Sequence, residues 1–361
     1  MKKSAFDDFI AAIRSDDIAR QEDAANKVCA LKDPVSLSHI LCVLKEEDPL
    51  TQRVMLWALR NYSSELDYAQ YLHYLSSEDL GVREAALMLF MDGGQPAVDT
   101  LVAGISSADM PTQYASVQAL GQFRVPGAIP ALISASSSSE QDIREIAVMS
   151  LGIYHDQAVV PTLVSALQDI PTVRLAALSG LRGRQLSAEE LSAVSLSLTD
   201  EREDIRAAAV YVLDGLTPGS LTADSSPYVR RALASVTAEI PVLITLCGDA
   251  DPSVRSAAAE SVRKQKLHLE DTLLPLLSDP VPGVRRAAAS ALGNSERSDV
   301  VPALIACLGD PKPGIRAAAA ASLGSIGGQP VILALKEAAN TENPILAGII
   351  KNALMTAEGK K

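Results

Sequence analysis

The chain has 361 residues, of which 48% are hydrophobic and only 4% aromatic, and it carries a net charge of −12. An acidic surface repels phosphate backbones, so this charge disfavours nucleic acid as a partner. No apolar run approaches the roughly 20 residues that span a bilayer, and the first residues lack the apolar segment of a signal peptide. We therefore expect a cytoplasmic protein with no membrane contact.

One sequence pattern returns about every thirty residues: in most copies an arginine or glutamine follows a small or apolar residue and precedes a run rich in alanine, and in the last copy Ala347 takes its place. We call this residue the anchor and number positions from it. In chain order the anchors are Gln21, Gln52, Arg83, Gln113, Arg144, Arg174, Arg206, Arg230, Arg255, Arg285, Arg316 and Ala347. A fixed period in this range is the signature of a solenoid.

Each anchor lies in a predicted helix, called helix B here. Apolar residues fall at positions −1, +2, +3, +6 and +7, which gather on one side of a helix. Asp or Asn before Pro would cap its start, as in Asp251-Pro252, Asp279-Pro280, Asp310-Pro311 and Asn343-Pro344. Glycine in left-handed backbone would end it, as in Leu120-Gly121, Leu151-Gly152, Leu292-Gly293 and Leu323-Gly324.

A second apolar segment, predicted as helix A, lies between successive B helices. These segments are Ser38–Lys45, Tyr68–Leu75, Ala97–Ile105, Ala128–Ala135, Ala158–Leu167, Leu267–Leu277, Val300–Leu308 and Val331–Ala338. Each repeat is therefore a helix–turn–helix, and the sequence predicts an all-α superhelix.

The four cysteines, Cys29, Cys42, Cys247 and Cys307, lie in apolar helical stretches without CxxC spacing, which predicts buried free thiols and a reducing compartment.

The unit Asp-Pro-x-x-Val-Arg-x-Ala-Ala-x-x-Leu-Gly resembles the HEAT repeat in its short form of about thirty residues, which also occurs in proteins that look like phycobilisome lyases. The resemblance covers about residues 16–355. It implies an α-solenoid, a right-handed superhelix of about twelve HEAT-like repeats, as a single domain over residues 1–361. It also implies an Asp–Arg ladder between neighbouring repeats, rather than a basic binding surface, formed by Asp251, Asp279 and Asp310 with Arg255, Arg285 and Arg316.

Positions +1, +4, +5 and +8 of helix B are expected to face a partner on the concave side of such a superhelix. In the first seven repeats these positions carry the large, adaptable residues that interface cores favour. The predicted binding residues are Trp57, Arg60, Met88, Met91, Tyr114, Met149 and Tyr211. The alternative is that these residues seal a tight superhelix. Residues 1–180 contain 13 Lys and Arg against 23 Asp and Glu, which would steer a basic segment of a partner toward them or merely aid solubility.

The repeat is irregular in the middle of the chain, where the anchor intervals on either side of Arg230 are 24 and 25 residues. Pro218 and Gly219 interrupt residues 216–227, so helix A is expected to be truncated or missing there. One interpretation is a hinge between arms 1–215 and 227–361. The other is a tolerated deletion in the array.

Motifs for catalysis, cofactors and metals are absent from the sequence. The four histidines form neither a His-Glu pair nor an i,i+4 pair that could hold a metal, and there is no phosphate-binding loop or nucleophile elbow. We therefore expect a non-enzymatic scaffold, adaptor or assembly factor that cradles a protein or peptide. The alternative implied by the resemblance is a bilin lyase that binds an open-chain tetrapyrrole.

Overall fold

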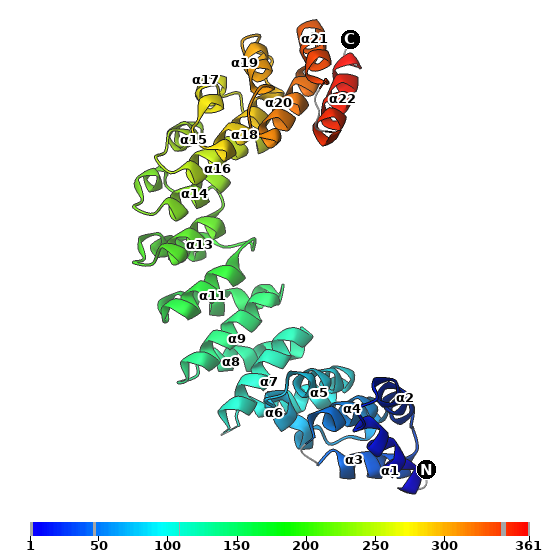
Figure 1. The fold of residues 1–361 in the computed structure, drawn as a ribbon. Helices are drawn as coiled ribbons and strands as arrows, with labels where there is room; N and C mark the ends of the chain where they lie inside the picture. The colour runs from blue at the N-terminus through cyan, green and yellow to red at the C-terminus, as the bar shows by residue number, and fades with distance from the viewer. Residues whose placement is uncertain (1–2, 46–47, 108, 341–343, 360–361) are drawn as a thin grey trace. The chain divides into compact units, whose positions relative to one another are not determined.

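The computed structural model of the chain describes residues 3–45, 48–107, 109–340 and 344–359, and every regular element in these ranges is a helix (Figure 1). The all-α prediction is confirmed. Contacts divide the chain into two compact units, Met1–Leu181 and Arg182–Lys361. The hinged arms 1–215 and 227–361 stay a prediction.

The first unit consists of α-helices joined by turns and by short 3-10 helices, labelled η. Its α-helices are α1 (Lys3–Ile13), α2 (Ile18–Cys29), α3 (Pro34–Val43), α4 (Pro49–Leu59), α5 (Leu80–Asp92), α6 (Gly94–Gly104), α7 (Met110–Phe123), α8 (Ile129–Ala135), α9 (Gln141–Ile153), α10 (Val160–Ser165) and α11 (Pro171–Leu181). Its 3-10 helices are η1 (Arg60–Glu65), η2 (Tyr68–Ser76), η3 (Pro126–Ala128), η4 (Gln157–Val159) and η5 (Ala166–Gln168).

The second unit repeats the same construction. Its α-helices are α12 (Ala188–Leu196), α13 (Glu203–Leu213), α14 (Pro227–Val236), α15 (Ile240–Cys247), α16 (Pro252–Lys264), α17 (Glu270–Leu273), α18 (Pro282–Ala291), α19 (Val300–Cys307), α20 (Pro313–Ile326), α21 (Gln329–Ala338) and α22 (Pro344–Glu358). Its 3-10 helices are η6 (Ser197–Thr199), η7 (Gly219–Ala223), η8 (Pro275–Ser278) and η9 (Leu292–Asn294).

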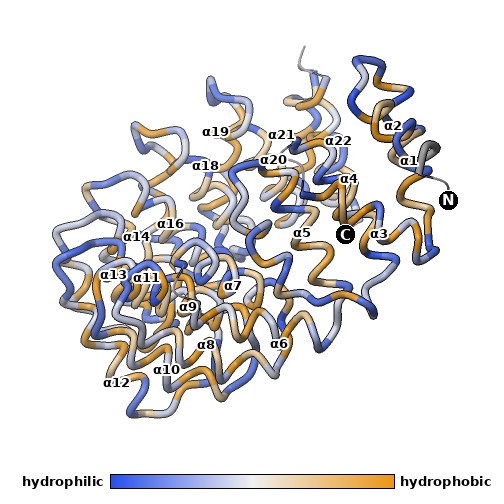
Figure 2. Tube along the Cα trace, turned by 90° about the horizontal axis from the view of Figure 1, so that it is seen from below, coloured by the Kyte–Doolittle hydropathy of each residue, from blue (hydrophilic) through white to orange (hydrophobic). Residues whose placement is uncertain are grey.

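Every anchor lies inside an α-helix, so the predicted B helices are confirmed. They are α2, α4, α5, α7, α9, α11, α13, α14, α16, α18, α20 and α22. Hydrophobic residues recur along the helices of both units (Figure 2). The eight predicted A helices fall on α3, η2, α6, α8, α10, α17 with η8, α19 and α21, while α1, α12 and α15 are further helices that the sequence analysis did not pick out.

The core follows the repeat, with one correction. Position +3 is buried in every repeat, and it is alanine in most of them, which lets the B helices approach closely. Position +4, expected to face a partner, is instead buried in most repeats. These buried residues are Leu56, Val117, Val148, Leu178, Val210, Ala234, Ala259, Ala289 and Ala320. The prediction was wrong because most B helices pack on the B helix of a neighbouring repeat as well as on their own helix A, as α16 does on α14 and α18.

The Leu-Gly pairs do not end the helices as expected. Gly121, Gly152 and Gly324 lie within α7, α9 and α20, and none of them has a positive φ. They are instead contact points between successive B helices. A Cβ on Gly152 would lie 3.0 Å from Cα of Gly180, and one on Gly324 would lie 2.8 Å from the carbonyl oxygen of Ala353. Glycine is required there because a side chain would push the neighbouring backbone away.

The B helices that follow an Asp-Pro pair begin in two different ways, whereas the sequence predicts that the Asp caps each of them. Asp251 is the N-cap of α16, where its carboxylate accepts the N–H of Ser253. Helices α18 and α20 begin later, at Pro282 and Pro313, because Asp279 and Asp310 lie in the turns before them. Asn343, the fourth predicted cap, lies outside the described residues, and Pro344 begins α22.

The anchor arginines of the second unit join neighbouring repeats through aspartates at position −6. Each arginine of this ladder pairs with the aspartate of the next repeat, which gives four ion pairs: Arg206–Asp224, Arg230–Asp249, Arg255–Asp279 and Arg285–Asp310. Arg230 donates through Nε and Nη2 to the Asp249 carboxylate at 2.7 and 2.9 Å, and its Nη1 donates to the carbonyl oxygen of Asp224 at 2.7 Å. Each arginine therefore ties its own turn to the turn of the next repeat.

The predicted ladder residues need one correction. Asp279 and Asp310 accept the guanidinium groups of Arg255 and Arg285, whereas Asp249 rather than Asp251 accepts that of Arg230. The dipeptide Asp-Pro does not mark one position of the repeat, because Asp251 lies four residues before its anchor and Asp279 lies six residues before its own. In this unit the aspartate at −6, rather than the one at −4, accepts an anchor arginine of the preceding repeat. Arg316 donates to the carbonyl oxygen of Asp310 at 2.8 Å, and its corresponding position in the next repeat lies outside the described residues.

Where the anchor is Gln21 or Gln113, in the first unit, it makes the hydrogen bond to its own turn but not the ion pair to the next repeat. Nε2 of Gln113 donates to the carbonyl oxygen of Ile105 at 2.5 Å, and Gln21 donates to that of Ser15. The shorter side chain holds its own turn, as Arg83 holds the carbonyl of Ser77. Positions −6 in this unit are mostly serine. Arg144 nevertheless reaches a carboxylate, because it donates to Asp169, at position −5 of the next repeat, at 2.7 and 2.8 Å.

The cysteines differ in exposure. Cys247 and Cys307 are buried, in agreement with the prediction, and burial raises the pKa of Cys247 to about 11. Cys42 is exposed and Cys29 is half-buried, so the expectation of four buried thiols was wrong for these two. Cys42 lies on the outward side of α3, whose packed residues are Ser36 and Ile40.

Candidate partner-binding face

Position +5 of the B helices forms an exposed row in the first unit. Trp57 on α4, Met88 on α5 and Met149 on α9 are 39%, 45% and 50% exposed, and Gln118 on α7 is also exposed. Tyr114, at position +1 of α7, is 40% exposed. We call Trp57, Met88, Tyr114 and Met149 the N-terminal row.

The row presents large apolar side chains because position +5 points away from both neighbouring helices. The residues on either side of it, at +3, +4 and +6, pack into the core: Met55, Leu56 and Ala58 surround Trp57 in sequence and are fully buried. The Arg53 guanidinium lies 5.2 Å from the centre of the Trp57 ring, which holds the indole by a cation–π contact. The Trp57 side chain is therefore exposed to solvent, while its contact with Arg53 restricts the orientation of its ring.

The remaining predicted residues have different surroundings. Arg60 pairs with Asp92 at the end of α5, so its charge is engaged in joining neighbouring repeats. Met91 is 53% exposed and borders an apolar cavity of about 260 Å³, which Phe90, Val98 and Phe123 also line. This cavity lies at the ends of α5 and α7 and at the start of α6, and it could receive one apolar side chain of a partner.

Four of the predicted residues lie on two pairs of packed helices, and one lies elsewhere. Helix α4, which carries Trp57, packs on α5, which carries Met88, and α7, which carries Tyr114, packs on α9, which carries Met149. Tyr211 belongs to the second unit, where it is half-buried and the Arg182 guanidinium lies 4.7 Å from its ring centre. Tyr211 is thus not part of the N-terminal row.

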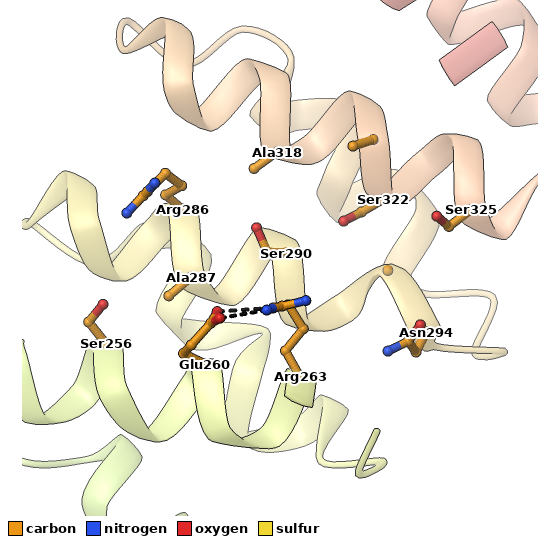
Figure 3. Close-up of a pocket in the computed structure, with 12 residues that line it drawn as sticks. Ser256, Glu260, Arg263, Arg286, Ala287, Ser290, Asn294, Ala318, Ser322 and Ser325 are labelled. Carbon is orange, nitrogen blue, oxygen red and sulfur yellow. Dashed lines mark hydrogen bonds and ion pairs between the residues drawn. The ribbon is translucent and has the colours of Figure 1, made fainter. Parts of the chain in front are cut away.

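A polar hollow on the B-helix face of the second unit was not predicted from the sequence. It lies over α16, α18 and α20 and has a volume of about 530 Å³ (Figure 3). Its charged residues are Glu260, Arg263 and Arg286. The signal available in the sequence is a pair of small residues at position +5, Ser290 and Ala321, in the repeats after a charged one, Glu260.

The described residues hold neither a cluster of metal ligands nor a membrane-spanning helix. Within the described ranges, no three His, Cys, Asp or Glu side chains gather as metal ligands would. None of the helices in the described part of the chain has the length and apolar character of a membrane span. His268 contacts Glu270 at 3.4 Å, and Glu270 also accepts the Ser295 hydroxyl at 2.7 Å, so this carboxylate joins two repeats.

The repeats match a known family. Profiles described as HEAT repeats match residues 98–182, 130–214 and 270–354, and a further HEAT-repeat profile matches residues 240–264, together more than half of the chain. The chain belongs to the HEAT-repeat family. As a HEAT-repeat protein it is an α-solenoid, as predicted, while the narrower resemblance to phycobilisome-lyase repeats stays a prediction. A comparison with curated proteins found no match.

Solved structures with the same fold are larger. A structure of importin β in an ammonium sulfate condition has a TM-score of 0.64 at 14% identity. The matched region covers 98% of this HEAT-repeat chain and 61% of the importin β chain. Kap95p with RanGDP and a Kap95:Nup1 complex have TM-scores of 0.56 at 13% and 12% identity. They cover 98% and 99% of this chain but 62% and 55% of their own, so this chain spans about three fifths of these relatives.

Proposed function

We propose that this HEAT-repeat chain is a non-enzymatic scaffold or adaptor whose N-terminal row binds a protein partner. The observation that carries the proposal is the exposure of Trp57, Met88, Tyr114 and Met149 on successive B helices. Tryptophan, tyrosine and methionine are enriched in the buried centres of protein interfaces, where they contribute most of the binding energy. Burying them against a partner would remove exposed apolar surface from water.

The charges beside the row favour a partner with a basic segment. Glu84 on α5 and Glu145 on α9 occupy position +1, four residues before Met88 and Met149 and thus one turn away on the same helices. Asp92 is already paired with Arg60. The surplus of acidic residues over residues 1–180 would also steer a basic segment toward this unit.

The solved relatives support a protein-binding role in general terms. Kap95p binds RanGDP in one of these structures and forms a complex with Nup1 in another. The same class of fold therefore presents contact surfaces to other proteins, and the N-terminal row is the surface that this chain offers.

Site-specific photo-crosslinking in cells of the host tests the proposal. A photoreactive phenylalanine at position 88 or 149 should crosslink to a protein, whereas the same group at Ile18, an even more exposed apolar residue outside the row, should not. The variant Trp57→Ala/Met88→Ala/Met149→Ala should lose the partner in a pull-down, and Ile18→Ala/Leu196→Ala should retain it. Equal capture by both variants would contradict the proposal.

The single tryptophan gives a second readout with purified components. Trp57 is the chain's one Trp and lies in the row, so a partner that covers it should raise its fluorescence and shift it to shorter wavelength. A partner that binds without changing this signal binds elsewhere. A red-shifted absorbance on adding an open-chain tetrapyrrole would instead favour the bilin-lyase alternative.

A further inference from the structure

The polar hollow on α16, α18 and α20, which we call the C-terminal hollow, is built by side-chain size. Position +5 is Glu260 on α16, Ser290 on α18 and Ala321 on α20, so large side chains give way to small ones along the row. Gly293 lets η9, which directly follows α18, approach α20 closely, because a Cβ on Gly293 would lie 2.7 Å from Oγ of Ser322. The result is an open depression whose floor is made of small residues.

One of the two arginines in the C-terminal hollow is paired with its carboxylate. Arg263 donates to Glu260 through Nε at 3.0 Å and Nη2 at 2.5 Å, as the dashed lines in Figure 3 show. This hydrogen-bonded pair is the main reason that the pKa of Glu260 lies below its usual value, and the charges of Lys264 and Arg286 lower it further. The three charged residues that line the hollow therefore carry one surplus positive charge, in a chain whose net charge is −12.

Arg286 is the cation placed to meet a ligand. It stands at position +1, as the fifth residue of α18, and is exposed. Its Cδ lies 3.8 Å from where a Cβ of Gly314 would be, so its stem runs toward the start of α20. Figure 3 shows Arg286 at one end of the hollow, with Ser290 and the Glu260–Arg263 pair further along.

Polar groups continue along the hollow beyond the charges. The lining includes the hydroxyl groups of Ser256, Ser290 and Ser325 and the amide of Asn294. Hydroxyl and amide groups can both donate to and accept from a peptide backbone. The volume of about 530 Å³ exceeds what a single bound ion requires and lies in the range of sites for larger ligands.

We propose that the C-terminal hollow binds an extended acidic segment of a protein, with an Asp or Glu carboxylate paired to Arg286. Guanidinium groups bind carboxylates through two parallel hydrogen bonds, and the serine and asparagine groups would hold the backbone that follows. Glu260 repels a continuous run of phosphates, which argues against a nucleic-acid strand. This site lies in the second unit and does not depend on the N-terminal row.

Fluorescence anisotropy with full-length protein tests the proposal. The probe is a fluorescein-labelled peptide of alternating Glu and Ser, and the control peptide has Gln in place of Glu. Wild type should bind the Glu peptide at least about tenfold more tightly than the Gln peptide, and raising the salt from about 50 to 300 mM should weaken binding. Equal binding of the two peptides would overturn the proposal.

Variants locate the binding on the molecule. Arg286→Ala should weaken binding of the Glu peptide about tenfold or more. Arg231→Ala is the matched control, because Arg231 is an exposed arginine at the same position +1 of α14 and lies outside the hollow. Ser290→Leu should also weaken binding by filling the floor without changing charge. Equal loss in Arg231→Ala, or no loss in Arg286→Ala, would place the peptide elsewhere.

Two further measurements separate this proposal from its competitors. Trp57→Ala/Met88→Ala/Met149→Ala should bind the Glu peptide as wild type does, so failure of the N-terminal row as a binding site leaves this result intact. Inorganic phosphate should displace the peptide only through its general effect on ionic strength, as sodium chloride does. Displacement at much lower phosphate concentration would identify a phosphate site and refute the peptide proposal. Circular dichroism establishes that each variant is folded.

Discussion

Arg255 donates two hydrogen bonds to the carboxylate of Asp279, at 2.8 and 3.0 Å, across 24 residues of sequence. A third hydrogen bond, 2.7 Å long, runs from its Nη1 to the carbonyl oxygen of Asp249 in its own turn. One side chain thus fixes the turn of its own repeat and the position of the next. Because both partners are largely shielded from water, the pair is stronger than an exposed ion pair.

Arg255→Gln should separate these two functions. Glutamine keeps the hydrogen bond to its own turn, as Gln113 does with Ile105, but cannot reach Asp279. The free energy of unfolding of the second unit should fall by about 1.5–3 kcal/mol, the value of hydrogen bonds to a charged group. Urea unfolding followed by thiol labelling of the buried Cys247 measures it.

Two controls accompany this variant. The unfolding transition seen by Trp57 fluorescence, which reports on the first unit, should shift much less than that of Cys247. Adding Asp279→Asn should recover part of the loss, because it removes the carboxylate left without its guanidinium. An unchanged Cys247 transition in Arg255→Gln would show that the ladder contributes nothing to stability.

Acid should weaken the ladder over a defined range of pH. The hydrogen bonds from Arg230 and Arg285 are the main reason that the pKa values of Asp249 and Asp310 lie below the usual value. A carboxylate with a lowered pKa in the folded state stabilises the protein above its unfolded pKa, about 3.9, and loses that contribution as the pH falls through the folded value. The stability of the second unit should therefore decline below about pH 4.

Asp249→Asn tests the origin of this decline. The variant should be less stable than wild type at neutral pH, and its free energy of unfolding should depend less steeply on pH below about 4. Asp16→Asn, at an exposed position of the first unit, is the control and should keep the wild-type slope. Equal slopes in wild type and Asp249→Asn would remove the ladder as the source.

Glycine at the contacts between B helices can be compared with glycine at an open position of the same helix pair. Gly324→Ala places a Cβ 2.8 Å from the carbonyl oxygen of Ala353, which is backbone and must move, so the variant should lose about 1–3 kcal/mol. Gly348→Ala, on α22 with nothing within 4 Å, should gain about 0.5–1 kcal/mol from better helix propensity. Urea unfolding of both variants gives the comparison, and a neutral Gly324→Ala would contradict it.

Hydrogen exchange decides between the hinge and the tolerated deletion at residues 216–227. Asp224 accepts Arg206 at 2.8 Å through both carboxylate oxygens, and its carbonyl accepts Arg230. The N–H of Ser226 is held by the same carboxylate at 2.8 Å. We expect hydrogen exchange at residues 216–227 to be as slow as in the Asp249–Asp251 turn, where the N–H of Asp251 donates to the Asp249 carboxylate in the same way. Faster exchange throughout 216–227 would support the hinge.

The helices and their burial pattern were predictable because they depend on local information. Alanine and leucine at helical spacing predict a helix with one apolar side, and the recurrence of that pattern predicts a stack. This reasoning placed every anchor in a helix and located the exposed Trp57, Met88 and Met149. It needed only the identities of residues within one repeat.

Contacts between repeats were decided by the tertiary structure alone. Position +4 is buried, Gly152 meets Gly180, and Asp249 replaces Asp251 in the ladder because neighbouring B helices approach at a particular distance and rotation. The C-terminal hollow has the same origin, since it exists only where the small side chains of α18 and α20 adjoin the larger ones of α16. By itself the sequence determined the repeat and its helices, whose causes lie within one turn; the packing of one repeat on the next set the rest.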